Sequence, residues 1–231
     1  MRLLDGTKLV DAAPDWRGVW PREGASIIVD AGSGDGRFAY ERARADPDSL
    51  YVALDPDADS LAQYAFRAGR KPARGGVPNV RFVVASLEDL PPELAGSAAK
   101  AYVNFPWGAL LRGVLRPEAP ILEALAALLA PAGQFELVLC FDPQHDAAVL
   151  AGEALRLDED RIDNVLTPAY RAAGLEIVER QRLSREEALA IPSSWGRRLL
   201  HGRSRDVFRV SGRRSPGGGD DNRGPSIEPD S

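Results

Sequence analysis

The stretch Val29-Asp30-Ala31-Gly32-Ser33-Gly34-Asp35-Gly36-Arg37 decides the fold that this sequence predicts. The apolar run 26–29 precedes it, and a helix-like run from Phe38 to Arg44 follows. A buried strand that turns through glycines into a helix leaves backbone N–H groups open to a ligand. We therefore predict a nucleoside-type cofactor bound at this turn of an α/β sheet.

Asp55 strengthens this prediction by its position. It follows Gly36 after nineteen positions and ends a second apolar run, residues 50–54. A carboxylate at the end of the second strand can accept hydrogen bonds from both hydroxyls of a ribose. The glycine turn and Asp55 together indicate a cofactor site rather than a tight turn alone.

The charge of the turn indicates which cofactor it binds. Asp30 and Asp35 flank the glycines, and their carboxylates would repel the pyrophosphate of a nicotinamide cofactor. S-adenosylmethionine carries a sulfonium and an ammonium group, which carboxylates attract. The spacing Asp-x-Gly-x-Gly-x-Gly also resembles the first motif of the class I methyltransferases. We therefore expect S-adenosyl-L-methionine.

Composition limits the other possibilities. The chain has 231 residues, of which 44% are hydrophobic, which suits one domain with a full core. No run is long enough to span a membrane, and the N-terminus does not resemble a signal peptide. Cys140 is the single cysteine, and His145 and His201 are too far apart in sequence to suggest a metal cluster. We expect a cytoplasmic protein with no metal and no disulfide.

The net charge of −5 hides two basic blocks. Five basic residues and no acidic residue lie between Arg67 and Arg81, and seven arginines accompany one aspartate between Arg197 and Arg214. A solvated surface is the simpler explanation for each block. Two separate blocks on an acidic protein nevertheless favour a nucleic-acid footprint.

The alternation of apolar runs and helical patterns predicts an α/β, doubly wound, seven-stranded sheet. A β-hairpin with an Asp5-Gly6 turn is expected at residues 1–11, and a linker is inserted at 185–205 between the last two strands. The domain is expected to cover 1–214, and the polar tail 215–231 to be disordered. The expected strands are 26–29, 50–54, 80–85, 101–103, 135–141, 175–180 and 207–210, and the expected helices 38–44, 57–68, 117–130 and 155–173.

Ligands of such sheets bind at the carboxyl ends of the strands, where several of the residues singled out here are expected to meet. Trp107 follows the fourth strand, although a lone tryptophan there is more often part of the core. Trp195 has basic neighbours in the linker, which makes a core role less probable for it. Two rings at one mouth can hold a planar base extruded from RNA, with arginines on the neighbouring phosphates.

Four motifs then resemble a known family: Asp-x-Gly-x-Gly-Asp-Gly-Arg at 30–37, Leu-Asp-Pro at 54–56, Phe-Pro-Trp-Gly at 105–108 and Ser-Ser-Trp at 193–195. They look like the aminoglycoside-resistance 16S rRNA methyltransferases, and within them the kanamycin–apramycin type, which methylates N1 of adenine 1408. The similarity covers roughly residues 1–212. It implies a class I, Rossmann-like methyltransferase fold.

The resemblance also implies roles for individual residues. Those expected around the flipped adenine are Trp107, Trp195, Phe105, Pro106 and Ser194. Those expected at the cofactor are Asp30, Gly32, Gly34, Asp55, Pro56, Ser86, Leu87, Glu88, Asn104 and Ser193, although either linker serine could serve the base. Those expected to dock on 16S rRNA of the assembled 30S subunit are Arg67, Arg70, Lys71, Arg197, Arg198, Arg203 and Arg205. The enzyme is expected to act as a monomer and to need no strong general base, because adenine N1 is already unprotonated at neutral pH.

Two alternatives stay open on the sequence. The acceptor could be another base or an exocyclic amine, since Asn104-Phe105-Pro106-Trp107 distantly resembles the Asn-Pro-Pro-Tyr motif of amine methyltransferases. Phe105 is extra in that comparison and upsets the spacing. The chain could also be a non-catalytic S-adenosylmethionine-binding factor that docks on rRNA during ribosome assembly.

Overall fold

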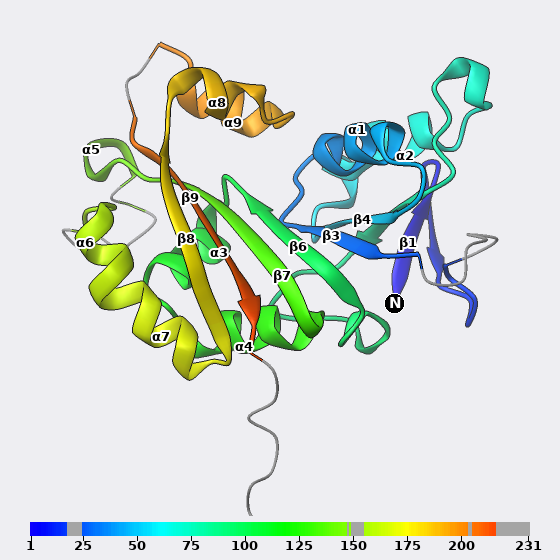
Figure 1. Cartoon of the computed structure of the whole chain (residues 1–231). Coiled ribbons are helices and arrows are strands. Elements are labelled where there is room, and N and C mark those ends of the chain that lie inside the picture. The colour runs from blue at the N-terminus through cyan, green and yellow to red at the C-terminus, as the bar shows by residue number, and fades with distance from the viewer. Residues whose placement is uncertain (18–24, 147, 149–154, 203–204, 216–231) are drawn as a thin grey trace, which may run out of the picture.

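The computed structural model describes residues 1–17, 25–146, 148, 155–202 and 205–215. Its centre is one nine-stranded sheet with the order β2-β1-β5-β4-β3-β6-β7-β9-β8 (Figure 1). The strands are β1 (Arg2–Asp5), β2 (Lys8–Asp11), β3 (Ile27–Ala31), β4 (Leu50–Asp55), β5 (Val80–Val84), β6 (Ala98–Asn104), β7 (Leu129–Cys140), β8 (Leu175–Leu183) and β9 (Val207–Arg214).

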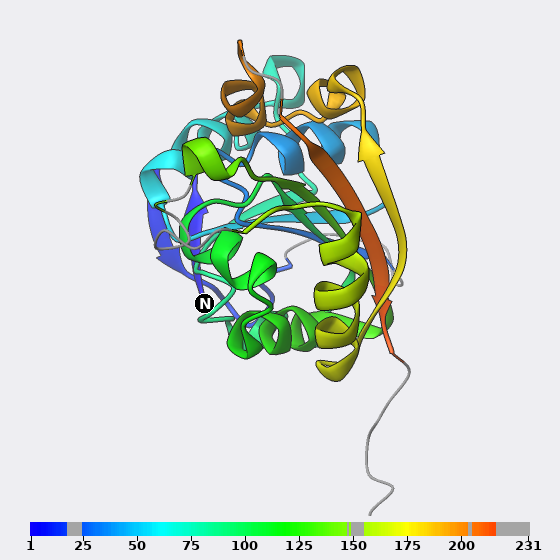
Figure 2. The same ribbon diagram turned by 90° about the vertical axis from the view of Figure 1, so that its left-hand side faces the viewer.

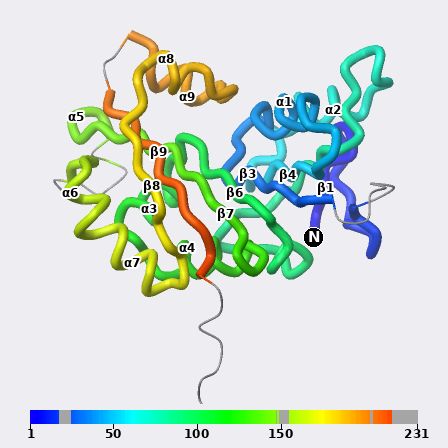
Figure 3. Tube along the Cα trace, in the orientation of Figure 1, coloured from blue at the N-terminus to red at the C-terminus, as the bar shows by residue number. Residues whose placement is uncertain are grey.

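The middle of the sheet is parallel and doubly wound, as predicted. Strand β3 pairs in parallel with β4 on one side and with β6 on the other. The strands β4 and β5 are therefore added on one side of β3, and β6 and β7 on the other side. The last strand, β9, is inserted antiparallel between β7 and β8 (Figure 3). Ligands bind at such a reversal point, beyond the carboxyl ends of the strands.

The N-terminal hairpin joins this sheet instead of standing apart from it. Leu3 of β1 pairs with Val83 of β5, which extends the seven expected strands to nine. The turn is also one residue later than predicted. Asp5 and Lys8 pair across the hairpin, so Gly6 and Thr7 form the turn, and only Gly6 has a positive φ, of 63°. One positive φ at the first turn position is the type II′ pattern, which needs glycine there.

The helices cover opposite faces of the sheet. On one face, α1 (Arg37–Ala45) and α2 (Ala58–Ala68) pack on β4 and β5. On the other face are α3 (Gly108–Leu115), α4 (Ala119–Leu128) and α7 (Thr167–Ala172). Figure 2 shows α7 beside β8 and β9. Side chains of β4 alternate between the two cores, with Val52 in one and Tyr51 in the other. Burial on both faces explains why the central strands are almost wholly apolar.

Three helical segments differ from the prediction. Helix α3 was not expected, and the linker 185–205 contains α8 (Arg185–Ala190) and α9 (Ser194–Leu200). The helix predicted at 155–173 consists of α6 (Glu159–Arg161), a π-helical stretch (Ile162–Leu166) and α7. The wider stretch precedes Pro168, which lacks the N–H that a regular helical turn would use.

The remaining described helical segments are short. They are Pro72–Arg74, Pro92–Leu94 and α5 (Pro143–Asp146). Within the described ranges, no helix is long and apolar enough to cross a membrane. The predicted disordered tail lies outside the described residues except for Ser215.

Candidate cofactor and target-base site

A cavity of about 670 Å³ opens at the carboxyl ends of β3, β4, β5 and β6. Its walls come from the glycine turn, the strand ends, α2, α3 and the start of α9. The lining residues are Asp30, Gly32, Ser33, Gly34, Asp35, Phe38, Asp55, Pro56, Ser60, Gln63, Ser86, Leu87, Glu88, Asn104, Phe105, Trp107, Ala109, Leu110, Ser193, Ser194, Trp195 and Arg198. Segments 165 residues apart in sequence therefore share one cavity, from Asp30 to Trp195.

The glycine turn forms the floor of the cavity. Gly32 and Gly34 have φ values of 70° and 60°, a region that other residues rarely adopt. A Cβ at Gly32 would lie 2.5 Å from Leu110 Cδ2, whereas a Cβ at Gly34 would point into open space. Gly32 is therefore needed for packing against α3, and Gly34 leaves its backbone open toward the cavity.

Asp55 is held with its two oxygens in fixed positions. One oxygen accepts from Gly34 N at 2.8 Å and the other from Asp57 N at 2.9 Å. Burial raises the pKa of Asp55, and the two backbone donors oppose that shift. Each carboxylate oxygen has a further lone pair, so the residue suits the paired hydroxyls of a ribose.

Asp30 is the most deeply buried acid of the cavity. It is 2% exposed, and Asn104 Nδ2 donates to its Oδ1 at 3.1 Å. Burial raises the pKa of Asp30 to about 7, with smaller contributions from the charges of Asp55 and Asp35. A cationic ligand would offset this desolvation and keep Asp30 ionised. The cavity thus combines a ribose acceptor with a carboxylate suited to a cation, which fits S-adenosylmethionine.

Trp107 and Trp195 lie together at the mouth, as the sequence suggested, but not as a ready sandwich. Trp107 is 44% exposed, so it is not a core tryptophan. The ring centroids are 5.2 Å apart, with an angle of 65° between the planes. This edge contact leaves no room for a third ring between them, so a base can enter only if one ring moves.

Trp195 makes more apolar contacts than its neighbours in the sequence indicated. It packs against the cluster that contains Phe105, Val138 and Leu199. Its indole N–H is buried and has no acceptor among the described residues. A buried donor without a partner costs about 1–3 kcal/mol. That cost favours any movement of the ring that gives the N–H a partner.

Three contacts hold α9 over the cavity. Ser193 caps the helix by accepting from Gly196 N at 3.0 Å, and Ser194 Oγ donates to Asp35 Oδ2 at 2.7 Å. Gly196 lies directly on the Phe105 ring, where a Cβ would come within 2.6 Å of two ring carbons. The helix that carries Trp195 is therefore tied to the glycine turn by Asp35 and to the end of β6 by Phe105.

Most of the residues predicted for the cofactor and the base line this cavity. Pro106 is the exception, because it is buried and does not belong to the lining. The cavity also contains residues that were not predicted, among them Ser60, Gln63 and Leu110. Helical spacing could have identified Ser60 and Gln63, since they lie four and seven positions after Pro56 on one face of α2. Leu110 could not be found, because α3 itself was missed.

The predicted docking residues divide into three groups. Arg67, Arg70, Lys71 and Arg197 are exposed, and Arg198 is exposed while also lining the cavity. Arg203 lies outside the described residues. The prediction for Arg205 needs correction, because its side chain is 2% exposed and pairs with the equally buried Asp146. A guanidinium buried against a carboxylate does not belong to the solvent-facing set.

Comparison of the chain with known proteins identifies its family. The family model described as NpmA, 16S rRNA (adenine(1408)-N(1))-methyltransferase, matches residues 2–214. A protein of that name from Streptoalloteichus tenebrarius is 37% identical over 191 residues, which is 82% of this chain and 88% of the relative. Another from Escherichia coli is 34% identical over 216 residues, 92% of this chain and 98% of the relative.

Solved structures agree with the sequence comparison. The crystal structure of the 16S rRNA methyltransferase KamB superposes with a TM-score of 0.85 at 34% identity, over 94% of this chain and all of that one. A tryptophan-to-alanine variant of the 16S rRNA (adenine(1408)-N(1))-methyltransferase from Catenulisporales acidiphilia, solved with its cosubstrate SAM, gives 0.84 at 33% identity. That match covers 97% of this chain and 99% of the other. The chain therefore belongs to the 16S rRNA (adenine(1408)-N(1))-methyltransferase family.

Proposed function

We propose that this protein transfers a methyl group from S-adenosylmethionine to N1 of adenine 1408 in 16S rRNA, and so confers aminoglycoside resistance. The observation that carries the proposal is one cavity with Asp55 and Asp30 at its base and two tryptophans at its mouth. The names of the relatives support the same reaction and target.

The cavity residues divide the task of holding the cofactor. When bound, S-adenosylmethionine supplies an electrophilic methyl group on a sulfonium. Asp55 would accept hydrogen bonds from the ribose hydroxyls, Asp30 would face the positive charge, and Leu87 and Glu88 would border the adenine. Gly34 keeps this approach open because it has no side chain. The fit rests on the fixed Asp55 oxygens and on the burial of Asp30.

The tryptophans would hold the target base at the mouth. Stacking on an aromatic ring offsets the cost of taking a base out of its helix by about 1–3 kcal/mol. Rate enhancement then comes from orientation, because the lone pair of adenine N1 needs no proton removed. Methylation at N1 places a positive charge on the base, which would repel the ammonium groups of an aminoglycoside.

The exposed cations extend the proposal to the assembled 30S subunit. Arg67, Arg70, Lys71 and Arg197 would contact phosphates and position the enzyme without reading sequence. We infer further that the protein acts as a monomer in the cytoplasm, where its ribosomal substrate is found.

An exocyclic-amine acceptor has less support. In amine methyltransferases with an Asn-Pro-Pro-Tyr motif, the asparagine side chain receives the amine. Here Asn104 is 8% exposed and its amide group donates to Asp30. This hydrogen bond directs the amide nitrogen toward Asp30 at the base of the cavity, and the extra Phe105 upsets the spacing of the motif.

Primer extension on 16S rRNA from cells that express the protein tests the proposal. Methylation at N1 blocks Watson–Crick pairing, so reverse transcription should stop one nucleotide on the 3′ side of adenine 1408. An Asp55→Ala variant should give no stop. A stop elsewhere, or a modified nucleoside with an N6-methyl group by mass spectrometry, would contradict the proposed target. Purified enzyme that binds 30S subunits but transfers no methyl group would instead favour a non-catalytic assembly factor.

A further inference from the structure

Phe66 is the most exposed phenylalanine, tyrosine or tryptophan side chain in the described part of the chain. It lies in the last turn of α2, two residues before the helix ends, and is 56% exposed. Leu61, Tyr64 and Ala65 form the buried face of the same helix, so α2 does not need Phe66 for its packing. A single exposed apolar residue is ordinary, and the surroundings of Phe66 decide whether it has a role.

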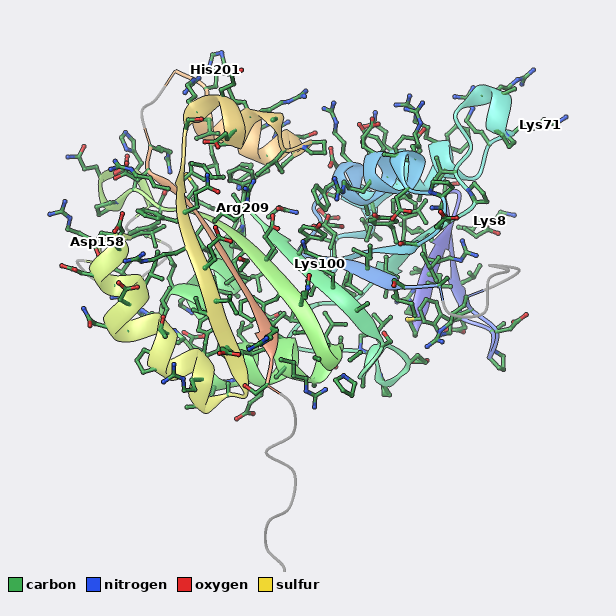
Figure 4. All side chains as sticks on the ribbon, viewed as in Figure 1. Lys8, Lys71, Lys100, Asp158, His201 and Arg209 are labelled. Carbon is green, nitrogen blue, oxygen red and sulfur yellow. The ribbon has the colours of Figure 1, made fainter. Side chains whose placement is uncertain are left out.

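The surroundings of Phe66 are strongly basic. Arg67 is its neighbour in the chain, and Arg70 follows two residues after the end of α2. Lys71 and Arg74 follow, and no acidic residue occurs from Phe66 to Arg81. Figure 4 shows Lys71 at the outer corner of the molecule, beyond α2 and away from the sheet. The ring therefore lies within a surface that attracts phosphates.

This basic surface is held in shape by the fold. Arg67 lies over the ring of Tyr40, with its guanidinium carbon 5.1 Å from the ring centroid. Tyr40 Oη donates to Gly75 O at 2.7 Å, and Val77 N donates to Ala68 O at 2.9 Å. The link that follows α2 is thus fastened to both helices. A surface that is already ordered loses little entropy when a partner binds.

Phe66 is also close to the candidate active site. Gln63 lies in the cavity wall and precedes Phe66 by three residues on α2. At a rise of about 1.5 Å per residue, the two Cα atoms are separated by about 4.5 Å along the helix axis. A nucleic acid that delivers a base to the cavity therefore passes within reach of the Phe66 ring.

We propose that Phe66 contacts a nucleotide of the rRNA beside the target base, as an uncharged contact within the basic surface. The proposal rests on the proposed function and adds a residue to it. The cations bind phosphates, whereas the ring packs on a ribose or on the face of an unpaired base. A second copy of this chain is a poorer occupant, because two surfaces that each carry four exposed cations (Arg67, Arg70, Lys71 and Arg74) would repel each other.

The test separates an uncharged contact from a charged one by its salt dependence. Binding of the full chain to purified 30S subunits is measured for Phe66→Ala, Phe66→Tyr and Arg70→Ala between 50 and 200 mM KCl, a range in which phosphate contacts change affinity strongly. Val178→Ala is the matched control, since Val178 is 64% exposed on β8 and belongs to no basic block. Melting temperature, oligomeric state and S-adenosylmethionine affinity are measured for each variant.

Phe66→Ala should weaken 30S binding by about fivefold to a hundredfold at every salt concentration, leaving the salt slope unchanged. Arg70→Ala should weaken binding and also reduce the slope, because one fewer counterion is released. Phe66→Tyr should retain most of the affinity, and Val178→Ala should bind like the unmodified protein. Affinity for S-adenosylmethionine and the melting temperature should stay the same throughout.

Several results would overturn the proposal. Unchanged 30S binding by Phe66→Ala, or an equal loss of binding in Val178→Ala, would contradict a specific contact. A reduced salt slope in Phe66→Ala would contradict an uncharged contact. A lower melting temperature of Phe66→Ala would assign the ring to the fold, and a loss of self-association would assign it to contact with a second copy of the chain. Failure of the proposed function looks different, because the unmodified protein would then leave adenine 1408 unmethylated while Phe66→Ala still weakened 30S binding.

Discussion

At the scale of single residues, Asp30 makes cofactor binding depend on pH. Its pKa of about 7 means that the free protein holds a proton there below neutrality. A cationic ligand needs the carboxylate, so affinity for S-adenosylmethionine should rise between pH 6 and 7.5. Below about pH 7.5 the cofactor's own amino group stays mostly protonated, because α-amino groups titrate near 7.7–8.0. Calorimetry across this range checks the prediction, and a flat profile would remove Asp30 from the cation site.

Asp30→Asn is the matched variant. It should bind the cofactor weakly and without the pH dependence. Without cofactor, the free energy of unfolding of Asp30→Asn at pH 8 should be higher than that of the unmodified protein, because the variant buries no ionised carboxylate at position 30. For the unmodified protein, the raised pKa means that the folded state binds the extra proton between about pH 4 and 7. The contribution of Asp30 to stability is therefore lost as pH rises through that window.

The two tryptophans should be separable from docking. Trp107→Ala and Trp195→Ala should each abolish most methyl transfer, because each ring is expected to contribute about 1–3 kcal/mol of stacking. Phenylalanine at either position should retain part of the activity. Affinity for 30S subunits should change little, since phosphate contacts dominate that step. Wild-type transfer by Trp195→Ala would contradict the stacking model, and an unfolded variant would assign the ring to the core.

At the scale of elements, the position of α9 is the feature most open to test. Gly196→Ala would place a Cβ 2.6 Å from the Phe105 ring, which is 2% exposed and cannot move away easily. We expect a loss of about 1–3 kcal/mol in the free energy of unfolding and a large loss of methyl transfer. Gly202→Ala is the comparison, since nothing lies within 4 Å of a Cβ there, although its φ of 67° adds strain. Equal activity losses in both variants would argue against the contact with Phe105.

The hydrogen bond from Ser194 to Asp35 links α9 with the cofactor turn. Ser194→Ala should lower methyl transfer several-fold, because Trp195 loses a support on the helix that carries it. Ser194→Thr keeps the hydroxyl and should retain activity. Direct S-adenosylmethionine binding should weaken less than transfer does. An equal loss in both measurements would instead place Ser194 on the cofactor.

Local sequence patterns predicted the helices and strands whose own residues show a clear glycine spacing or apolar run. The glycine turn, Asp55 and the apolar runs of β3 and β4 predicted the floor of the cavity and the centre of the sheet. Helix α3 was missed because Gly108 and Gly113 interrupt a sequence that packing makes helical: Gly113 lies against Ile121 of α4, where a Cβ would come within 2.3 Å. The burial of Arg205 was missed because its partner, Asp146, is 59 residues away in sequence. The edge contact of the tryptophans depends on the tertiary position of α9, which no local pattern contains.

At the scale of the whole molecule, the second basic block is not one surface. Arg197 and Arg198 lie on α9, and Arg198 lines the cavity. Arg213 lies opposite Gln134, in the middle of β7, and pairs with Glu176 at 2.7 Å. Six residues of β9 separate Val207, opposite Cys140, from Arg213, which amounts to about 20 Å along the strand. Sequence proximity therefore joined cations that the fold separates.

This separation gives a charge-reversal test. Arg197→Glu should weaken 30S binding and reduce its salt dependence between 50 and 200 mM, whereas Arg213→Glu should leave both nearly unchanged. Both variants change the net charge by two units, so a general electrostatic effect would affect them equally. Filter binding with purified subunits measures the difference. A similar loss in both would mean that the far end of β9 also faces the ribosome.

The place of β9 also has a consequence for the synthesis of the protein. The strand is made after β8 but is inserted between β7 and β8, so β8 has no partner in the sheet until residue 214 has been added. α9, which carries Trp195, is packed partly on Val207 at the start of that strand. A growing chain thus cannot complete the end of the cavity that contains Trp195 before β9 is made. We therefore expect methyl transfer only from chains that have been translated past β9, and a premature stop before β9 should yield an inactive product.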